Sequence, residues 1–144
     1  MPLKTGDPLP EGVDWPKGPL VVYFYPKDFT GVCTKEACEF RDIYDTLKKD
    51  FGAEVIGVSR DSDETHERFK AEHRLPFRLI ADRGGKLSKA FGVERLWGLI
   101  PFVKRVTFVA DAGGVIRGVF HHELDAARHV RDVRETLSAL AKGP

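Results

Sequence analysis

A continuous apolar run, Leu20 to Tyr25, constrains the fold of this chain more than any other feature of its sequence. Its valines and aromatic residues favour β-structure, and Pro26 ends the run because proline interrupts a central strand. A strand with no polar face must be covered on both sides, as strands are in the middle of a parallel or mixed sheet. The run therefore predicts a central strand with helices packed on both faces of its sheet.

The rest of the chain alternates predicted strands and helices. Further strands are expected at 54–59, 77–81, 106–110 and 115–120, and helices at about 34–51, 63–74, 85–91 and 125–141. Gly113 and Gly114 indicate a hairpin between the last two strands, because glycine reaches the positive φ angles of tight turns. Asp61, with Glu64 three residues later, resembles a capping box for the second helix. This order predicts an α/β, thioredoxin-like fold with a central mixed β-sheet flanked by helices on both faces.

Length and charge bound the domain organisation and the partners. A length of 144 residues suits one hydrophobic core, so we expect a single domain over 1–144. Residues 1–19 are rich in proline and glycine and predict an extended, loop-rich lead-in, with the packed part beginning after it. A net charge of +1 with interspersed signs argues against nucleic acid as a partner. No apolar run is long enough for a bilayer and no signal-peptide pattern is present, so we expect a cytoplasmic protein with no membrane partner.

Two cysteines, Cys33 and Cys38, follow the first predicted strand. At the start of a helix, unpaired backbone N–H groups and the helix dipole favour a thiolate at Cys33. Full ionisation raises the reactive fraction of a thiol only about tenfold near neutral pH, so ionisation alone does not make a fast thiol enzyme. A reaction in which negative charge grows on a departing atom, such as an oxygen, also needs hydrogen-bond donors aimed at that atom. Thr30, nearby backbone N–H groups and a distant arginine are the candidates.

The spacing of the two cysteines restricts how they can react with each other. In an unbroken helix the Cα atoms of Cys33 and Cys38 would lie roughly 8 to 9 Å apart. That separation exceeds the roughly 7 Å limit for a disulfide, so a bond between them requires the helix start to unwind. The spacing alone leaves open the alternative of two unrelated, buried and inert cysteines.

The string YFYPKDFTGVCTKEACEFRD gives the cysteines a context, because it sets Pro26, Thr30 and Cys33 in a Pro-x-x-x-Thr-x-x-Cys arrangement. With this string the chain resembles the peroxiredoxin family, in its bacterioferritin comigratory protein or PrxQ branch. The resemblance continues more loosely through FGVERLWG and KRVTFVAD to the predicted hairpin. Gly31 and Val32 stand where this branch usually has Pro-Gly, and the short region before Leu20 leaves little room for the family's N-terminal hairpin.

The resemblance implies an enzyme of antioxidant defence, a thioredoxin-dependent peroxidase. Hydrogen peroxide or an organic hydroperoxide would oxidise Cys33, the peroxidatic cysteine, to a sulfenic acid, and Cys38 would resolve it as an intramolecular disulfide. Thioredoxin or a similar dithiol reductant would then restore the two thiols. The resemblance implies no cofactor and no metal, and we expect a monomer or a weak homodimer.

The resemblance also implies roles for three other residues. Pro26 shields the thiolate from water, Thr30 hydrogen-bonds the peroxide, and Arg105 places positive charge beside Cys33. Lys104 competes for that last role, but adjacent strand residues point to opposite faces, and we choose Arg105. A helix cap at Thr30 is an alternative that does not exclude catalysis. Glu36 is interpreted as a first-turn residue that stabilises the helix dipole, outside the catalytic set.

Other functions remain open at this point. A thioredoxin-like disulfide oxidoreductase would share the fold, but its Cys-x-x-Cys signature is absent because four residues separate Cys33 from Cys38. A peroxide-sensing redox relay would use the same thiols with little turnover. The spacing of Cys33, Cys38, His121 and His122 argues against a metal site.

Two groups of side chains receive simpler interpretations. His66 and His73 are interpreted as solvated helix positions. The aromatic residues Phe29, Trp97 and Phe102 could line an apolar mouth for bulky hydroperoxides, but core packing is the preferred interpretation for each of them.

Overall fold

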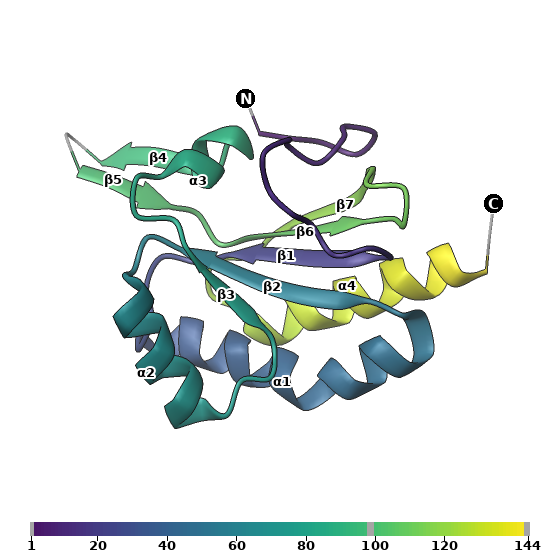
Figure 1. The fold of residues 1–144 in the computed structure, drawn as a ribbon, viewed down its shortest axis with the longest axis horizontal. Coiled ribbons are helices and arrows are strands. Elements are labelled where there is room, and N and C mark those ends of the chain that lie inside the picture. Colours follow the sequence, from purple (N-terminus) through teal and green to yellow (C-terminus); the bar gives the residue numbers. More distant parts are fainter. Residues whose placement is uncertain (1, 98–99, 143–144) are drawn as a thin grey trace.

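The computed structural model, which describes residues 2–97 and 100–142, contains one central sheet, a small hairpin and four helices (Figure 1). The elements in chain order are β1 (Leu20–Phe24), α1 (Gly31–Phe51), β2 (Glu54–Ser59), α2 (Asp63–His73), β3 (Arg78–Ala81), α3 (Lys86–Ala90), β4 (Glu94–Trp97), β5 (Ile100–Val103), β6 (Val106–Ala110), β7 (Ile116–His121) and α4 (Ala126–Ala141). Within the described residues, no helix combines the length and apolar character needed to cross a bilayer.

The central sheet confirms the prediction made from the apolar run. Its strand order is β3-β2-β1-β6-β7, with β1 parallel to β2 and antiparallel to β6. Every residue of β1 is buried, as a strand covered on both faces must be. The predicted hairpin is also confirmed, since β6 and β7 pair antiparallel. Gly114 takes φ 80° in its turn, where the Asp111 carboxylate accepts backbone hydrogen bonds from Gly113 and Val115.

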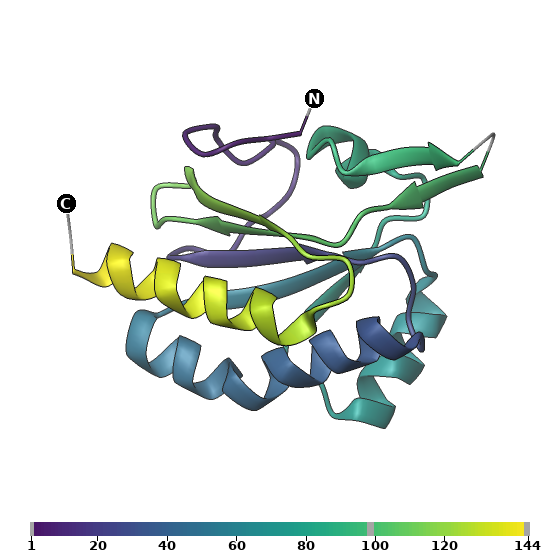
Figure 2. The ribbon, with the colours of Figure 1, turned by 180° about the vertical axis from the view of Figure 1, so that it is seen from behind.

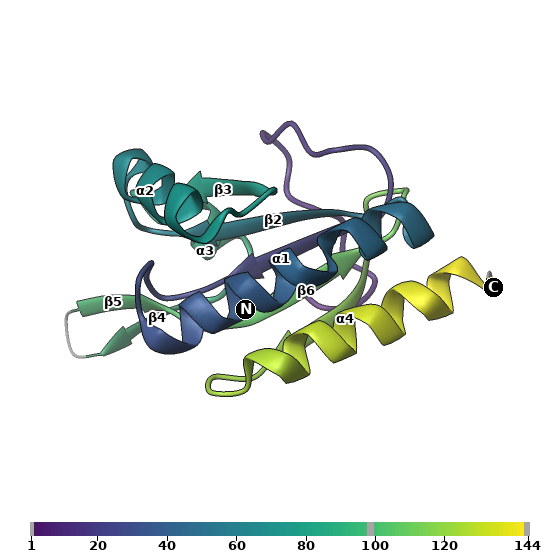
Figure 3. The same cartoon turned by 90° about the horizontal axis from the view of Figure 1, so that it is seen from below.

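One face of the sheet is covered by α1, α2 and α4, which lie on its lower side in Figure 1 and are seen from below in Figure 3. The core on this side contains stacked aromatic rings, with Tyr23 between Tyr25 and Phe40 at centroid distances of 5.4 and 4.8 Å. Cys33 belongs to the same buried cluster. The cysteine-bearing start of α1 is therefore fixed against the central strand.

The opposite face is covered by α3, the β4–β5 hairpin and the lead-in (Figure 2). Helices on both faces are thus confirmed, although α3 is a single short helix. Residues 2–19 have the predicted loop character, with an isolated bridge between Pro8 and Val115. The interpretation that packing begins after residue 19 is wrong, because apolar lead-in side chains cover a face that would otherwise be bare: Leu3, Leu9, Val13 and Trp15.

Local boundaries differ from the sequence prediction in three places. Helix α1 begins at Gly31, three residues before the predicted start. The capping box at Asp61 is wrong: Ser62 is the N-cap of α2, and its side chain accepts a hydrogen bond from the Thr65 backbone N–H. The β4–β5 hairpin was not predicted, because two four-residue strands that pair only with each other leave a weak pattern.

Candidate active site

Cys33 lies in the first turn of α1, as predicted, directly after the loop that leaves the carboxyl end of β1. Its side chain is 1% exposed. Thr30 occupies the N-cap position, and the first backbone N–H groups of the helix have no partner within the helix. The sulfur therefore sits where the positive end of the helix dipole favours an anion.

Arg105 reaches this sulfur from the segment between β5 and β6. Its Nη1 lies 3.1 Å from Cys33 Sγ and 3.1 Å from Glu36 Oε1. Its Nε donates to the Glu123 carbonyl at 2.8 Å, which fixes the plane of the guanidinium group. Burial alone would lower the pKa of Arg105, but the acidic groups of Cys33 and Glu36 outweigh burial and raise it. The choice of Arg105 over Lys104 thus agrees with the geometry around Cys33.

Glu36 is a site residue that sequence reasoning missed. It is fully buried in the second turn of α1, so its interpretation as a first-turn residue that acts only on the helix dipole is wrong. Burial raises its pKa to about 8, even though the charge and hydrogen bond of Arg105 act in the opposite direction. Near neutral pH the carboxyl group is therefore mainly protonated. The positive charge of Arg105 is then available to a thiolate at Cys33.

A second buried side chain, His129, lies next to Glu36 and is uncharged. Its Nε2 donates to the His122 carbonyl at 2.7 Å, so its Nδ1 is left to accept from the Thr107 hydroxyl at 2.8 Å. Burial lowers the pKa of His129 to about 4, which keeps the ring neutral at neutral pH. Glu36 Oε2 lies 3.7 Å from this ring and has no hydrogen-bond partner among the described residues.

Thr30 and Pro26 flank the same loop. The Thr30 carbonyl accepts from the Thr34 N–H at 2.8 Å, but its hydroxyl donates to the Lys27 carbonyl at 2.9 Å and makes no cap hydrogen bond. The side-chain cap considered for Thr30 is therefore absent. Both Pro26 and Thr30 are exposed, at the two ends of the loop that leads to Cys33.

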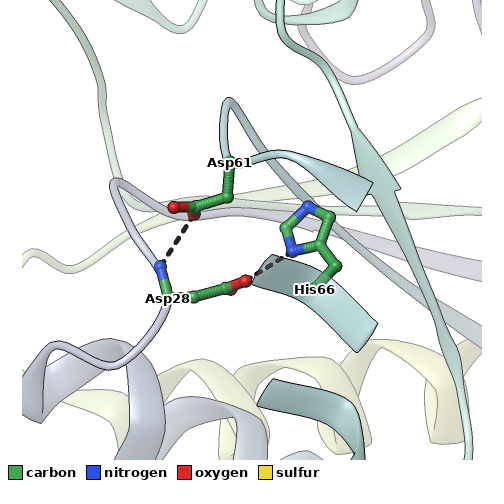
Figure 4. A group of neighbouring side chains, drawn as sticks. All are labelled: Asp28, Asp61 and His66. Carbon is green, nitrogen blue, oxygen red and sulfur yellow. Dashed lines mark hydrogen bonds and ion pairs between the residues drawn. The ribbon is translucent and has the colours of Figure 1, made fainter. Parts of the chain in front are cut away.

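The loop is anchored to α2 through Asp28, which Figure 4 shows between Asp61 and His66. Asp28 Oδ2 lies 2.6 Å from His66 Nδ1, and Asp28 Oδ1 accepts from the Tyr25 hydroxyl at 2.6 Å. The Asp28 backbone N–H donates to Asp61 at 2.8 Å. His66 is buried, so its interpretation as a solvated helix position is wrong.

The Asp28–His66 pair must share a proton. His66 Nε2 faces the Ile80 carbonyl at 3.0 Å and has to donate to it, so Nδ1 meets the carboxyl group with one proton between the two. Burial lowers the pKa of His66, but the hydrogen bond and charge of Asp28 outweigh it and raise that pKa overall. Ligand atoms of Asp28, Asp61 and His66 all lie within 4.8 Å of one another, yet each is already engaged, so we interpret the group as a loop anchor.

Replacing His66 by alanine is expected to reduce the free energy of unfolding by about 3 kcal/mol at pH 6, because the Asp28 carboxylate loses its buried partner. The stabilisation from this pair is fully present below about pH 6.5, the ordinary histidine pKa. It is lost as pH rises through the raised folded-state pKa, so the cost of the substitution shrinks at alkaline pH. Urea denaturation at pH 6 and pH 9 measures both values.

The matched control for this prediction is His121→Ala, which breaks an exposed pair with Glu123. It should cost less than about 1 kcal/mol. An equal cost for His66→Ala at pH 6 and pH 9 would show that the pair does not share a titrating proton.

Phe29 carries backbone strain beside Cys33. Its φ is 64°, a left-handed conformation that costs a non-glycine residue about 1 kcal/mol or more. Its ring is 45% exposed and lies edge-on to Phe69. Phe102 is also exposed, so core packing is the wrong interpretation for both residues. The side chain of Trp97 lies outside the described residues.

Cys38 lies further along α1 and is half-buried. Both cysteines are free thiols, and Cys38 Sγ is 3.9 Å from His73 Nδ1. His121 and His122 bind the carboxylates of Glu123 and Asp132 instead, at 2.6 and 2.7 Å. Of these three histidines, the half-buried His73 is therefore the one whose ring contacts a cysteine sulfur.

The buried sulfur of Cys33 lies in the first turn of α1 and 3.1 Å from a guanidinium group, surroundings of the kind that favour the thiolate form of a cysteine. The thioredoxin-like sheet and this thiol define the class: a thiol-dependent redox protein.

Comparison with known proteins gives the family within that class. The sequence matches the AhpC/TSA family over residues 13–119. The chain therefore belongs to the AhpC/TSA family, in its peroxiredoxin Q branch. It is 42% identical to the chloroplastic peroxiredoxin Q of Sedum lineare, over 96% of this chain and 74% of that protein. It is 44% identical to that of Suaeda salsa, over 85% of this chain but only 56% of that protein.

Solved structures agree with the family and the fold. A PrxQ mutant from Xylella fastidiosa superposes with a TM-score of 0.88 at 28% identity, covering 98% of this chain and 99% of that one. The peroxidoxin BcpB from Mycobacterium tuberculosis gives 0.86 at 31% identity, covering 95% and 97%. The bacterioferritin comigratory protein of Xanthomonas campestris, described in terms of its alkyl peroxide reduction activity, gives 0.78 at 33% identity, covering 86% and 80%.

Proposed function

We propose that this protein is a thioredoxin-dependent peroxidase that reduces hydrogen peroxide and organic hydroperoxides. The observation that carries the proposal is the contact of 3.1 Å between Arg105 Nη1 and Cys33 Sγ, with both groups buried at the start of α1. The family and the alkyl peroxide reduction named for the Xanthomonas campestris relative support the same chemistry. We further propose that 1–144 acts as one domain, as a monomer or weak homodimer.

In the first step the Cys33 thiolate attacks the nearer peroxide oxygen and the O–O bond breaks. Cys33 becomes a sulfenic acid, and the departing alkoxide or hydroxide takes up a proton to leave as alcohol or water. Negative charge grows on the departing oxygen, so Arg105 and the backbone N–H groups at the helix start stabilise the transition state. The exposed Thr30 hydroxyl hydrogen-bonds the peroxide, and Pro26 limits access of water to the sulfur.

In the second step the Cys38 thiol attacks the Cys33 sulfenic acid, which gives an intramolecular disulfide and one molecule of water. Both cysteines lie in one continuous helix, Gly31–Phe51, so the sulfurs can meet only after the start of α1 unwinds. The strained Phe29 backbone favours that opening, because unwinding releases the strain. A thioredoxin-type dithiol then reduces the disulfide and becomes oxidised itself.

The proposal is tested by peroxide consumption of the reduced protein, first in a single turnover and then with a thioredoxin system. Cys33→Ser is expected to abolish the reaction. Cys38→Ser should retain one turnover and lose recycling by thioredoxin. If the wild-type protein reacts no faster than a free thiol, the peroxidase proposal fails and a disulfide oxidoreductase or sensor role takes its place.

A further inference from the structure

Helix α2 presents two histidines to the thiol site. His66, Phe69 and His73 are spaced by three and four residues, so they lie on one face of the helix. His66 holds the loop before Cys33, whereas His73, the last residue of the helix, meets Cys38. Helix α2 thus supplies one histidine to the loop before Cys33 and another to Cys38.

Residue His73 is held in place through both its backbone and its ring. Arg41 Nη1, one turn beyond Cys38 on α1, donates to the His73 carbonyl at 2.9 Å. The ring packs edge-on against Phe69 at a centroid distance of 5.0 Å and tilted against Phe29 at 6.4 Å. The contact of 3.9 Å between Nδ1 and Cys38 Sγ is therefore held by the Arg41 hydrogen bond and the two aromatic rings.

The charged and titratable groups around Cys38 come from three elements. Arg41 on α1 lies close enough for its charge to interact with Cys38, but it is paired with Asp42 at 3.0 Å. Tyr23 on β1 is fully buried, and burial raises the pKa of its hydroxyl well above 10, so it keeps its proton. Among these groups, His73 on α2 is the one with a ring nitrogen beside the sulfur, and the nitrogen of a neutral imidazole is a proton acceptor.

We propose that His73 is a catalytic residue of the disulfide-forming step, in which its Nδ1 takes the proton of the Cys38 thiol as Cys38 attacks Cys33. This inference rests on the proposed function. The Cys38 sulfur bonds to the Cys33 sulfur, the S–O bond breaks, and the departing hydroxide receives the proton from the imidazolium as water. No external oxidant is needed beyond the peroxide that formed the sulfenic acid.

The same contacts indicate which cysteine moves. Arg41 ties the Cys38 region of α1 to the end of α2, while the strained Phe29 lies on the Cys33 side. Unwinding from the helix start brings Cys33 to a Cys38 that stays beside His73. When a reductant later attacks the Cys33 sulfur, Cys38 leaves as a thiolate and takes up a proton from solvent, so a thiol again faces the neutral His73 ring.

The test separates oxidation of Cys33 from disulfide formation in a single turnover with hydrogen peroxide. Trapping the sulfenic acid with dimedone follows the first phase, and mass spectrometry of the disulfide follows the second. In His73→Asn the first phase should change less than about twofold, and the second should slow about tenfold at pH 7, because a free thiol is only a few per cent ionised there. The deficit should close by about pH 9.5, where thiols ionise without help, and added imidazole should restore the rate in His73→Ala.

The matched control is His122→Asn, which removes another half-buried histidine, one that binds Asp132 and not a cysteine. It should leave both phases unchanged. A His73→Asn variant that forms the disulfide at the wild-type rate at pH 7, or that is slowed equally at pH 7 and pH 9.5, overturns the role of His73 while the peroxidase proposal stands. Absence of any Cys33–Cys38 disulfide in the wild type overturns the two-cysteine mechanism itself.

Discussion

Replacing Arg105 by methionine is expected to lower the second-order rate constant for reaction of the reduced protein with hydrogen peroxide by about 10²- to 10³-fold. Methionine keeps much of the side-chain volume but removes the charge 3.1 Å from Cys33 Sγ. In the proposed mechanism it also removes the donor that stabilises the departing oxygen. Stopped-flow measurement of peroxide consumption in a single turnover gives the rate constant directly.

Two further variants separate charge from geometry at this position. Arg105→Lys keeps the charge, but a lysine cannot donate to Cys33, Glu36 and the Glu123 carbonyl from one planar group, so an intermediate loss of about tenfold or more is expected. Lys104→Met is the neighbouring control and should stay within about twofold of the wild type. A folded Arg105→Met protein that reacts at the wild-type rate would remove Arg105 from the mechanism.

The central strand and the placement of Cys33 could be predicted because their signals are local. A continuous apolar run must be covered on both faces, and the Pro-x-x-x-Thr-x-x-Cys arrangement follows it directly. Arg105 lies far from Cys33 in the sequence, yet the resemblance singled it out. The thioredoxin-like sheet agrees with that resemblance, and so do the solved peroxiredoxin Q structures.

Glu36 and His66 could not be assigned correctly, because their burial depends on contacts distant in sequence. Placing the start of α1 three residues too late put Glu36 in the first turn, where an exposed carboxylate stabilises the helix dipole. His66 lies on a helix of mainly polar residues, which gives no sign of a buried face at that position. Its partner Asp28 comes from a different loop, and only the packing of α2 brings them together.

The lead-in, residues 1–19, shows that predicted loop character does not indicate whether a segment is buried. Its prolines and glycines correctly excluded helices and strands, but loop character says nothing about burial. Leu9 and Trp15 pack against the core on the face opposite α1, beside the short helix α3 and the β4–β5 hairpin. The sequence pattern marked these residues as unstructured, although they pack against the core.

Arg105 contacts two acidic groups, Cys33 and Glu36. The protonation state of Glu36 therefore determines how much of the Arg105 charge acts on a Cys33 thiolate. If both Cys33 and Glu36 were ionised, two buried anions would share one guanidinium group. A pKa of about 8 for Glu36 avoids this near neutral pH, because the carboxyl group holds its proton. The neutral ring of His129 behind it adds no competing charge.

Replacing Glu36 by glutamine is expected to raise the free energy of unfolding at pH 8 by about 4 kcal/mol relative to the wild type, and to leave it nearly unchanged at pH 4.5. In the folded protein Glu36 keeps a proton up to about pH 8, whereas in the unfolded chain it loses that proton near pH 4.5. The folded state thus binds more protons in this window, so wild-type stability falls as pH rises through it. Glutamine mimics the protonated acid, can still accept from Arg105, and carries no such penalty.

Urea denaturation of both proteins between pH 4.5 and 8.5 measures this difference, with Glu39→Gln, a half-buried position on the same helix, as the matched control. The peroxide rate of Glu36→Gln at pH 7 should stay within a few-fold of the wild type, because the native group is already neutral there. A stability difference that does not change with pH would mean that Glu36 is ionised in the folded protein. Arg105 would then divide its charge between two anions, and the large loss expected for Arg105→Met would have to include the cost of an unpaired buried carboxylate.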